Sequence, residues 1–214
     1  MSETTAEVKM GQTVFIVDDD PSIREGVTNL LESVGIAALS YSSAEEFKRH
    51  WSPDGAGCLL LDARLPGASG VEFQEQMRAA GVGLPTVFMT AHGDIPMVRK
   101  VMKAGAVEFL VKPFQKEELL HAVNEAFALD RKRREEEEGR RKIGTRIASL
   151  SPREREVMAM VTSGLLNKQI AAELNISEVM VKTHRRNMMD KMQADSLAEL
   201  VKLCERAQGR TGSR

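Results

Sequence analysis

Short apolar runs alternate with longer segments of helical periodicity through the first 127 residues. The apolar runs read TVFIV, IAALS, GCLLL, PTVFM and VEFLV. The helical segments that follow them cover residues 23–31, 44–51, 70–80, 95–103 and 116–127. Apolar runs without strict alternation are typical of strands buried on both faces. Five β/α repeats with right-handed crossovers therefore predict an open, doubly wound α/β fold around a five-stranded parallel sheet, with sites at the carboxyl ends of its strands.

From Leu150 onward the strand-like runs disappear and only helical patterns remain. Ser151 is a favourable N-cap, Pro152 suits the first helical position, and Glu154 is acidic in the first turn. The segments 151–164, 167–175, 177–192 and 196–207 then predict four short helices. We therefore expect an all-α domain of four helices over residues 150–207.

The stretch between the two patterned regions, DRKRREEEEGRRKIGTR, consists almost entirely of charged residues. We expect a solvated helix running into a linker, supported by Glu–Arg contacts one turn apart. A coiled-coil signalling helix is the alternative, but the apolar positions that such a helix requires are missing. The predicted organisation is an N-terminal tail (1–12), an α/β domain (13–127), a charged helical linker (128–149), the four-helix domain (150–207) and a C-terminal tail (208–214).

Charge is distributed unequally between the two predicted domains, although the net charge is only −1. Residues 1–127 contain 11 Lys and Arg against 18 Asp and Glu, whereas residues 146–214 contain 12 against 8. The basic end is the candidate for binding a polyanion such as nucleic acid. The two cysteines are far apart and have no metal-ligand spacing. With no apolar stretch long enough to span a bilayer, the sequence predicts a cytoplasmic protein without a membrane partner.

Polar residues follow four of the five predicted strands. Asp18, Asp19 and Asp20 follow the first strand, and Asp62 follows the third. Carboxylates that meet at one sheet edge repel one another unless a cation lies among them, and hard oxygen ligands suit Mg²⁺. Thr90 and Lys112 end the last two strands and add a hydroxyl and a cation. This combination predicts a phosphoryl site in which a carboxylate attacks.

The motifs VDDDP, LLLDARLPGASG, MTAHGD and FLVKPF match, in order and spacing, the receiver domain of two-component response regulators. The resemblance covers about residues 13–127 and implies the flavodoxin-like receiver fold. It further implies that a sensor histidine kinase phosphorylates Asp62, and that the receiver promotes only its own phosphorylation and dephosphorylation. The remaining implied roles are Mg²⁺ binding by Asp18, Asp19, Asp62 and the main-chain carbonyl of Arg64, phosphoryl contacts by Thr90 and Lys112, a switching aromatic at Phe109, and a cis Lys112–Pro113 peptide bond.

Arg64 and His92 lie two residues beyond Asp62 and Thr90, respectively. In receivers these positions line the entrance to the site. We expect their side chains either to tune how fast water removes the phosphoryl group or simply to face solvent.

The segment NKQIAAELNISEVMVKTHRRNMMDKM has the features of a helix-turn-helix. Asn175 suits the left-handed residue of the turn, and Ser177 can cap the second helix. The wider stretch, about 150–207, resembles the DNA-binding domain of LuxR/NarL-type regulators, although Met180 stands where that family usually has Thr. The resemblance implies structural roles for Glu154 and Glu156 and a helix end at Gly164. It directs Lys182, Thr183 and Arg186 toward base edges, and Lys168, Ser177, Arg185 and Lys191 toward phosphates.

The order receiver, linker and LuxR-type domain resembles the FixJ class of response regulators. It implies that phosphorylation remodels the face of the fourth helix and fifth strand, and that dimerisation brings two helix-turn-helices onto double-stranded DNA. RNA polymerase is a further candidate partner. One alternative is an aspartyl-phosphate phosphohydrolase, but the sequence shows neither a cap nor a DxD loop. The other is a pure protein-interaction module, which DNA shift assays would distinguish.

Overall fold

The computed structural model describes residues 11–52, 55–66, 68–91, 93, 95–207 and 209. The predicted tails (1–12 and 208–214) therefore lie largely outside the described residues. The chain divides into two compact units, Met1–Arg134 and Glu135–Arg214, which are described separately below. Among the described residues, no helix combines the length and apolar character needed to cross a bilayer.

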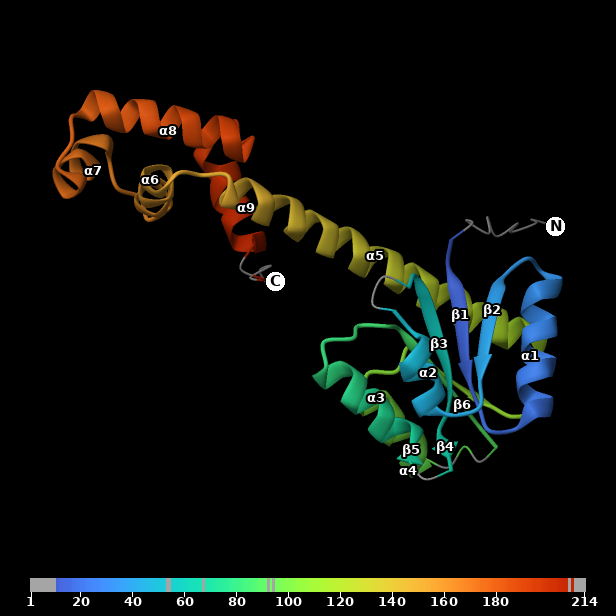
Figure 1. The fold of residues 1–214 in the computed structure, drawn as a ribbon. Helices are drawn as coiled ribbons and strands as arrows, with labels where there is room; N and C mark the ends of the chain where they lie inside the picture. Colours follow the sequence, from blue (N-terminus) through green and yellow to red (C-terminus); the bar gives the residue numbers. More distant parts are fainter. Residues whose placement is uncertain are drawn as a thin grey trace, which may run out of the picture. The chain divides into compact units, whose positions relative to one another are not determined.

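A five-stranded parallel sheet forms the centre of the first unit (Figure 1). Its strands are β1 (Thr13–Val17), β2 (Ala37–Tyr41), β3 (Gly57–Asp62), β6 (Thr86–Thr90) and β7 (Glu108–Val111). They are arranged in the order β2-β1-β3-β6-β7, so β1 and β3 are neighbours. The chain places β2 on one side of β1 and then adds β3, β6 and β7 on the other side. This order confirms the predicted doubly wound α/β fold.

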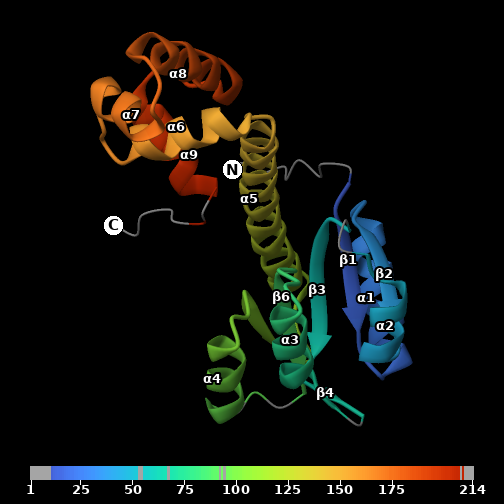
Figure 2. The same cartoon turned by 60° about the vertical axis from the view of Figure 1, so that its left-hand side comes forward.

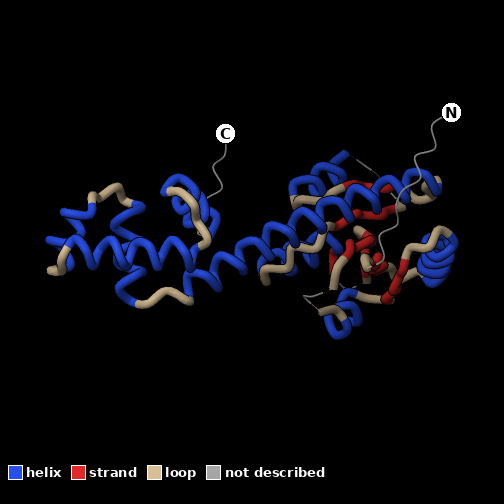
Figure 3. Tube along the Cα trace, turned by 90° about the horizontal axis from the view of Figure 1, so that it is seen from above, coloured by secondary structure: helices blue, strands red, loops and turns tan. Residues whose placement is uncertain are grey.

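Helices cover both faces of this sheet, with the strands lying between them in Figure 3. Successive strand residues point to opposite faces, so Val14 and Ile16 pack with α1 (Pro21–Ser33) and the first part of α5 (Lys116–Ala148). Phe15 and Val17 pack on the other side with α2 (Ala44–His50), α3 (Gly70–Ala79) and α4 (Ile95–Lys103). Burial on both faces explains why the strands read as continuous apolar runs.

A short antiparallel hairpin, absent from the predicted elements, follows β3. It pairs β4 (Arg64–Leu65) with β5 (Ala68–Ser69) and projects beyond the end of β3 (Figure 2). Two-residue strands leave no periodic pattern in a sequence, which explains why it was missed.

The helix α5 extends through the whole of the charged stretch, which was expected to be a solvated helix running into a linker. That expectation is wrong at two positions. The side chain of Asp130 is fully buried and accepts hydrogen bonds from Arg133, Arg134 and the Gly57 amide. Further along, Ile143 is 5 % exposed and belongs to the core of the second unit.

The second unit contains four further helices, as predicted: α6 (Pro152–Thr162), α7 (Asn167–Leu174), α8 (Glu178–Met192) and α9 (Leu197–Ala207). Ser151 and Glu154 form a reciprocal capping box at the start of α6. Asn175 has a φ of 53°, which is the left-handed conformation expected between α7 and α8. Ser177 caps α8 by accepting a hydrogen bond from the Met180 amide. The core includes the fully buried Ile170, Val181, Met188 and Met192.

Candidate functional sites

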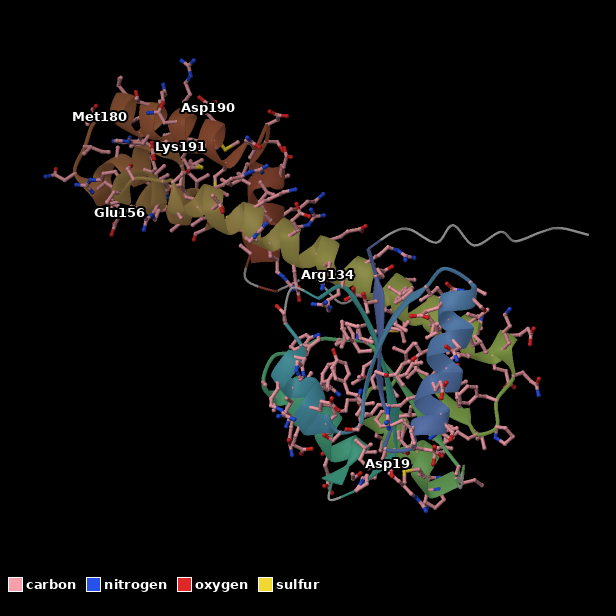
Figure 4. The ribbon with its side chains drawn as sticks, turned by 45° about the vertical axis from the view of Figure 1, so that its right-hand side comes forward. Asp19, Arg134, Glu156, Met180, Asp190 and Lys191 are labelled. Atoms are coloured by element: carbon pink, nitrogen blue, oxygen red, sulfur yellow. The ribbon has the colours of Figure 1, made fainter. Side chains whose placement is uncertain are left out.

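Three carboxylates meet at the carboxyl ends of β1 and β3. Asp18 follows β1 and Asp62 is the last residue of β3, and these strands pair in register from Thr13–Gly57 to Val17–Leu61. One carboxylate oxygen from each of Asp18, Asp19 and Asp62 lies within 4.8 Å of the others. Asp18 and Asp62 are buried, whereas Asp19, labelled in Figure 4, is exposed. The structure thus brings together the three acids that the sequence proposed as metal ligands.

Lys112 joins this cluster from the residue after β7. Its Nζ lies 2.5 Å from an oxygen of Asp18 and 2.5 Å from an oxygen of Asp62. Burial raises the pKa of Asp18, although its hydrogen bond from Lys112 opposes that effect. Burial would lower the pKa of Lys112, but its bonds to the two carboxylates outweigh it and the pKa is raised. Lys112 therefore remains protonated and neutralises part of the negative charge.

Backbone groups fix the orientation of the two buried carboxylates. The second oxygen of Asp62 accepts a 2.7 Å hydrogen bond from the Arg64 amide, and that of Asp18 accepts a 3.0 Å bond from the Asp20 amide. Asp20 itself caps α1 by accepting a hydrogen bond from the Ser22 amide. These bonds leave little rotational freedom at the site.

Two residues that support the site were not singled out from the sequence. Arg24 on α1 donates to the main-chain oxygens of Asp18 (2.7 Å) and Asp19 (2.9 Å). A Cβ atom at Gly70 would lie 2.1 Å from the carbonyl oxygen of Asp62, so only glycine allows α3 to begin there. Arg24 is the fourth residue of its helix and belongs to no motif, so the sequence alone does not mark it as part of the site. Gly70 is the last residue of the motif LLLDARLPGASG, and that motif could have identified it.

Thr90 ends β6 at the same edge of the sheet as the charged cluster, whereas Phe109 lies two residues before the end of β7 and pairs with Phe88. Thr90 is the buried last residue of β6, and its carbonyl accepts a 2.7 Å bond from the Lys112 amide. Phe109 on β7 is partly buried and packs against the core beside α2, α3 and α4. The Lys112–Pro113 peptide bond is cis, which confirms that expectation.

The donor set fits a hard divalent cation. Carboxylate oxygens at this separation are the ligands that Mg²⁺ prefers, and the exposed position of Asp19 leaves room for water ligands. Arg64 lies on β4 with its side chain exposed, so the structure leaves both expectations for that side chain open. His92, the other residue expected at the entrance, lies outside the described residues.

The exposed face of α8 carries the residues expected to meet DNA bases. Lys182, Thr183 and Arg186 are all exposed, whereas Val181, Met188 and Met192 on the opposite side are fully buried. Among the described residues, neither Lys182 nor Arg186 has a hydrogen bond or ion pair. This helix face therefore presents two cations to solvent in the geometry of a helix-turn-helix.

Three of the four residues expected to contact phosphates make hydrogen bonds or ion pairs within the domain. Lys168 is exposed, and Ser177 accepts the capping bond of α8. Arg185 donates to Asn167 (3.1 Å), and Lys191 forms a 2.7 Å ion pair with the buried Glu154. The structural role expected for Glu154 is thus visible. Glu156, labelled in Figure 4, makes only an exposed pair with Arg153.

Comparison with known proteins assigns both parts of the chain. The family described as response regulator receiver domain matches residues 14–124, and the family of bacterial regulatory proteins named luxR matches residues 148–204. Nodulation protein W of Bradyrhizobium diazoefficiens is 47 % identical over 192 residues, covering 90 % of this chain and 85 % of that protein. The transcriptional regulatory protein FixJ of Azorhizobium caulinodans is 40 % identical, covering 89 % of this chain and 90 % of that protein. The solved structure of the response regulator StyR matches with a TM-score of 0.80 and 49 % identity, covering 91 % of this chain and 98 % of that one.

Proposed function

The chain belongs to the response regulators that join a receiver domain to a LuxR-type DNA-binding domain, and we propose that phosphorylation of Asp62 by a histidine kinase controls its binding to DNA. One observation carries this proposal: Asp62 is held at the strand ends by Lys112, beside two further acids. Because its target is DNA, we place the protein in the cytoplasm.

In the proposed transfer, an oxygen of Asp62 attacks the phosphorus atom of a phosphohistidine. A P–O bond forms while the P–N bond to the imidazole of the donor breaks. Lys112 already contacts Asp62 and can pair with the new phosphoryl oxygens, while Thr90 at the end of β6 supplies a hydroxyl. The chain's own chemistry is limited to gaining and losing this group, so we propose no other enzymatic activity.

Asp18, Asp19, Asp62 and the carbonyl of Arg64 would hold Mg²⁺, which would supply positive charge for the phosphoryl oxygens. Without a divalent cation, Lys112 is the one cationic side chain among the described residues that pairs with Asp18 and Asp62. We therefore propose that phosphorylation requires the metal.

A hollow of about 200 Å³ beside Lys112 supports docking of the kinase. It lies between α1 and the segment after β7, and its lining includes Ile23, Leu30, Pro113 and Phe114. An apolar hollow next to the acceptor can position a protein donor by burial of nonpolar surface.

We further propose that the phosphorylated protein dimerises through α4 and β7. Three apolar side chains there are exposed in the described part of this unit: Ile95 (75 %), Met102 (47 %) and Val111 (48 %). A dimer would offer two helix-turn-helices to adjacent half-sites, with Lys182, Thr183 and Arg186 toward bases. Phosphate contacts would come from Lys168, Ser177, Arg185 and Lys191. To make this contact, Lys191 would leave its ion pair with Glu154. RNA polymerase would be the partner of the DNA-bound form.

Footprinting of genomic DNA fragments tests this function, using the full chain with and without acetyl phosphate and Mg²⁺. We expect protected sites to appear at lower protein concentration after phosphorylation, and Asp62→Ala to show no such change. A DNA affinity that depends on salt but not on phosphorylation would contradict the proposed control. Turnover of a generic phosphate ester would favour a phosphohydrolase instead.

A further inference from the structure

The first turn of α8 exposes two apolar side chains among its polar neighbours. Val179 is 71 % exposed and Met180 is 49 % exposed, although neither packs into the core of the domain. Figure 4 shows Met180 at the beginning of α8, with Asp190 toward its other end.

Val179 lies on the cationic face of α8, at the N-terminal end of that face. At 100° per residue, Val179, Thr183 and Arg186 fall within about 60° of one another around the helix axis. Lys182 borders this group, and the buried Val181, Met188 and Met192 occupy the opposite side. Lys182 and Arg186, which have no hydrogen bond or ion pair among the described residues, therefore lie on one side of the valine, toward the C-terminal end of α8.

The hydroxyl of Thr183 is already used within the helix. Its Oγ1 donates a 3.1 Å hydrogen bond to the carbonyl of Val179. Around Val179 the helix thus presents methyl groups more than hydrogen-bond donors. Further along the same face, Asp190 is exposed and would repel phosphates, so the half of α8 that contains Val179 is the half suited to DNA.

Among the four bases, only thymine presents a methyl group in the major groove. A side chain without donors or acceptors can distinguish bases there only through apolar contact with that group. We propose that Val179, bordered by Met180, recognises the 5-methyl group of a thymine in the binding site. This inference rests on the proposed DNA-binding function and assigns one component of its sequence specificity. The charges of Lys182 and Arg186 favour DNA as the occupant of this face over another apolar surface.

Replacement of thymine by deoxyuridine tests the proposal, because it removes the methyl group and keeps the hydrogen-bonding pattern. A site is selected from random DNA with the full-length phosphorylated protein, and each thymine in it is replaced in turn. We expect one thymine per half-site at which the replacement weakens binding about fourfold, as burial of one methyl group implies. The Val179→Ala variant should lose this sensitivity at that thymine alone.

The control variant is Leu129→Ala, which truncates a 48 % exposed apolar side chain on α5 and should retain the full uracil effect. In a second measurement the critical T:A pair is replaced by C:G. There, 5-methylcytosine should bind the parent protein more tightly than cytosine, and Val179→Ala should not distinguish them.

Equal affinity for thymine and uracil at every position would overturn the proposal, as would a uracil effect unchanged in Val179→Ala. Either result would leave the proposed DNA-binding function intact. Absence of any DNA binding by the phosphorylated parent would overturn both.

Discussion

The two units of this protein hold their functional side chains in opposite ways. At the receiver site, Asp18, Asp62 and Lys112 are largely buried and satisfy one another's charges across the ends of separate strands. On α8, Lys182 and Arg186 project from one helix into solvent. Assembly of the first site thus depends on the whole sheet, whereas the second needs only a correctly placed helix. Substitutions within the buried cluster of the receiver should therefore affect chemistry and folding together, whereas substitutions on the exposed face of α8 should affect binding alone.

Removal of the acceptor carboxylate should have the largest effect. Asp62→Asn keeps the size of the side chain and removes the nucleophile, so we expect no incorporation of the phosphoryl group from acetyl phosphate, measured by phosphate-affinity electrophoresis. Asp20→Asn is the matched control, because Asn also caps helices and the Asp20 side chain accepts its hydrogen bond from the Ser22 amide, away from the cluster. Equal phosphorylation of Asp62→Asn and the parent would place the acceptor elsewhere.

A second substitution in the first unit tests how much a buried charge contributes to stability, separately from phosphorylation. Asp130→Ala would leave the side chains of Arg133 and Arg134 and the Gly57 amide without their shared acceptor. We expect a loss of about 3–5 kcal/mol in the free energy of unfolding of the first unit, measured by urea denaturation. The phosphorylation rate at 25 °C should change little in the molecules that remain folded, because no described bond links Asp130 to Asp62.

The control for that measurement is Arg131→Ala, which removes only an exposed hydrogen bond to Gln12 and should cost less than about 1 kcal/mol. If Asp130→Ala were no more destabilising than Arg131→Ala, the buried network would not contribute to stability.

The sequence predicted the sheet, its flanking helices and the receiver cluster because burial leaves a direct pattern there. A strand buried on both faces is a continuous apolar run, and the polar residue that ends it, such as Asp62, marks the sheet edge. The carboxyl ends of parallel strands share one edge of the sheet, and the proximity of Asp18, Asp62 and Lys112 then depends on the strand order β1-β3-β6-β7.

Contacts of charged residues with partners far along the chain were not predictable in the same way. Asp130 stands in a run of charges and reads as solvated, yet it contacts the Gly57 amide 73 residues away. The partner of Lys191 is Glu154, 37 residues earlier. Such pairs depend on which charged side chain the fold happens to enclose, and the hydrophobic pattern does not encode that choice.

The exposed helix face should give an intermediate effect on binding and none on folding. Arg186→Ala is expected to weaken binding to a selected DNA site by about 1–3 kcal/mol and to relax the preference at one base pair. Lys168→Ala should instead weaken binding to all sequences and reduce the dependence of affinity on salt. Fluorescence anisotropy titrations at several salt concentrations measure both, with the exposed Lys202→Ala on α9 as the control. A measurable loss of thermal stability in Arg186→Ala would contradict the contrast between the two units.

The smallest predicted effect concerns Glu154, where the second unit resembles the first in burying a charge. Its pKa is lowered, first by the hydrogen bond from Lys191 and then by that from the Ser151 amide. A lowered pKa means that the ionised group stabilises the folded state above the ordinary pKa of glutamate, about 4.3, and that this contribution is lost as the pH falls through the folded-state value. Glu154→Gln keeps an amide oxygen for the capping box but removes the charge, and because Lys191 is 41 % exposed we expect a cost of about 1 kcal/mol or less at pH 7. The free energies of unfolding of variant and parent should converge as the pH is lowered through the folded-state pKa of Glu154, and a difference that stayed constant throughout the acid titration would show that Glu154 acts through packing and not through its charge.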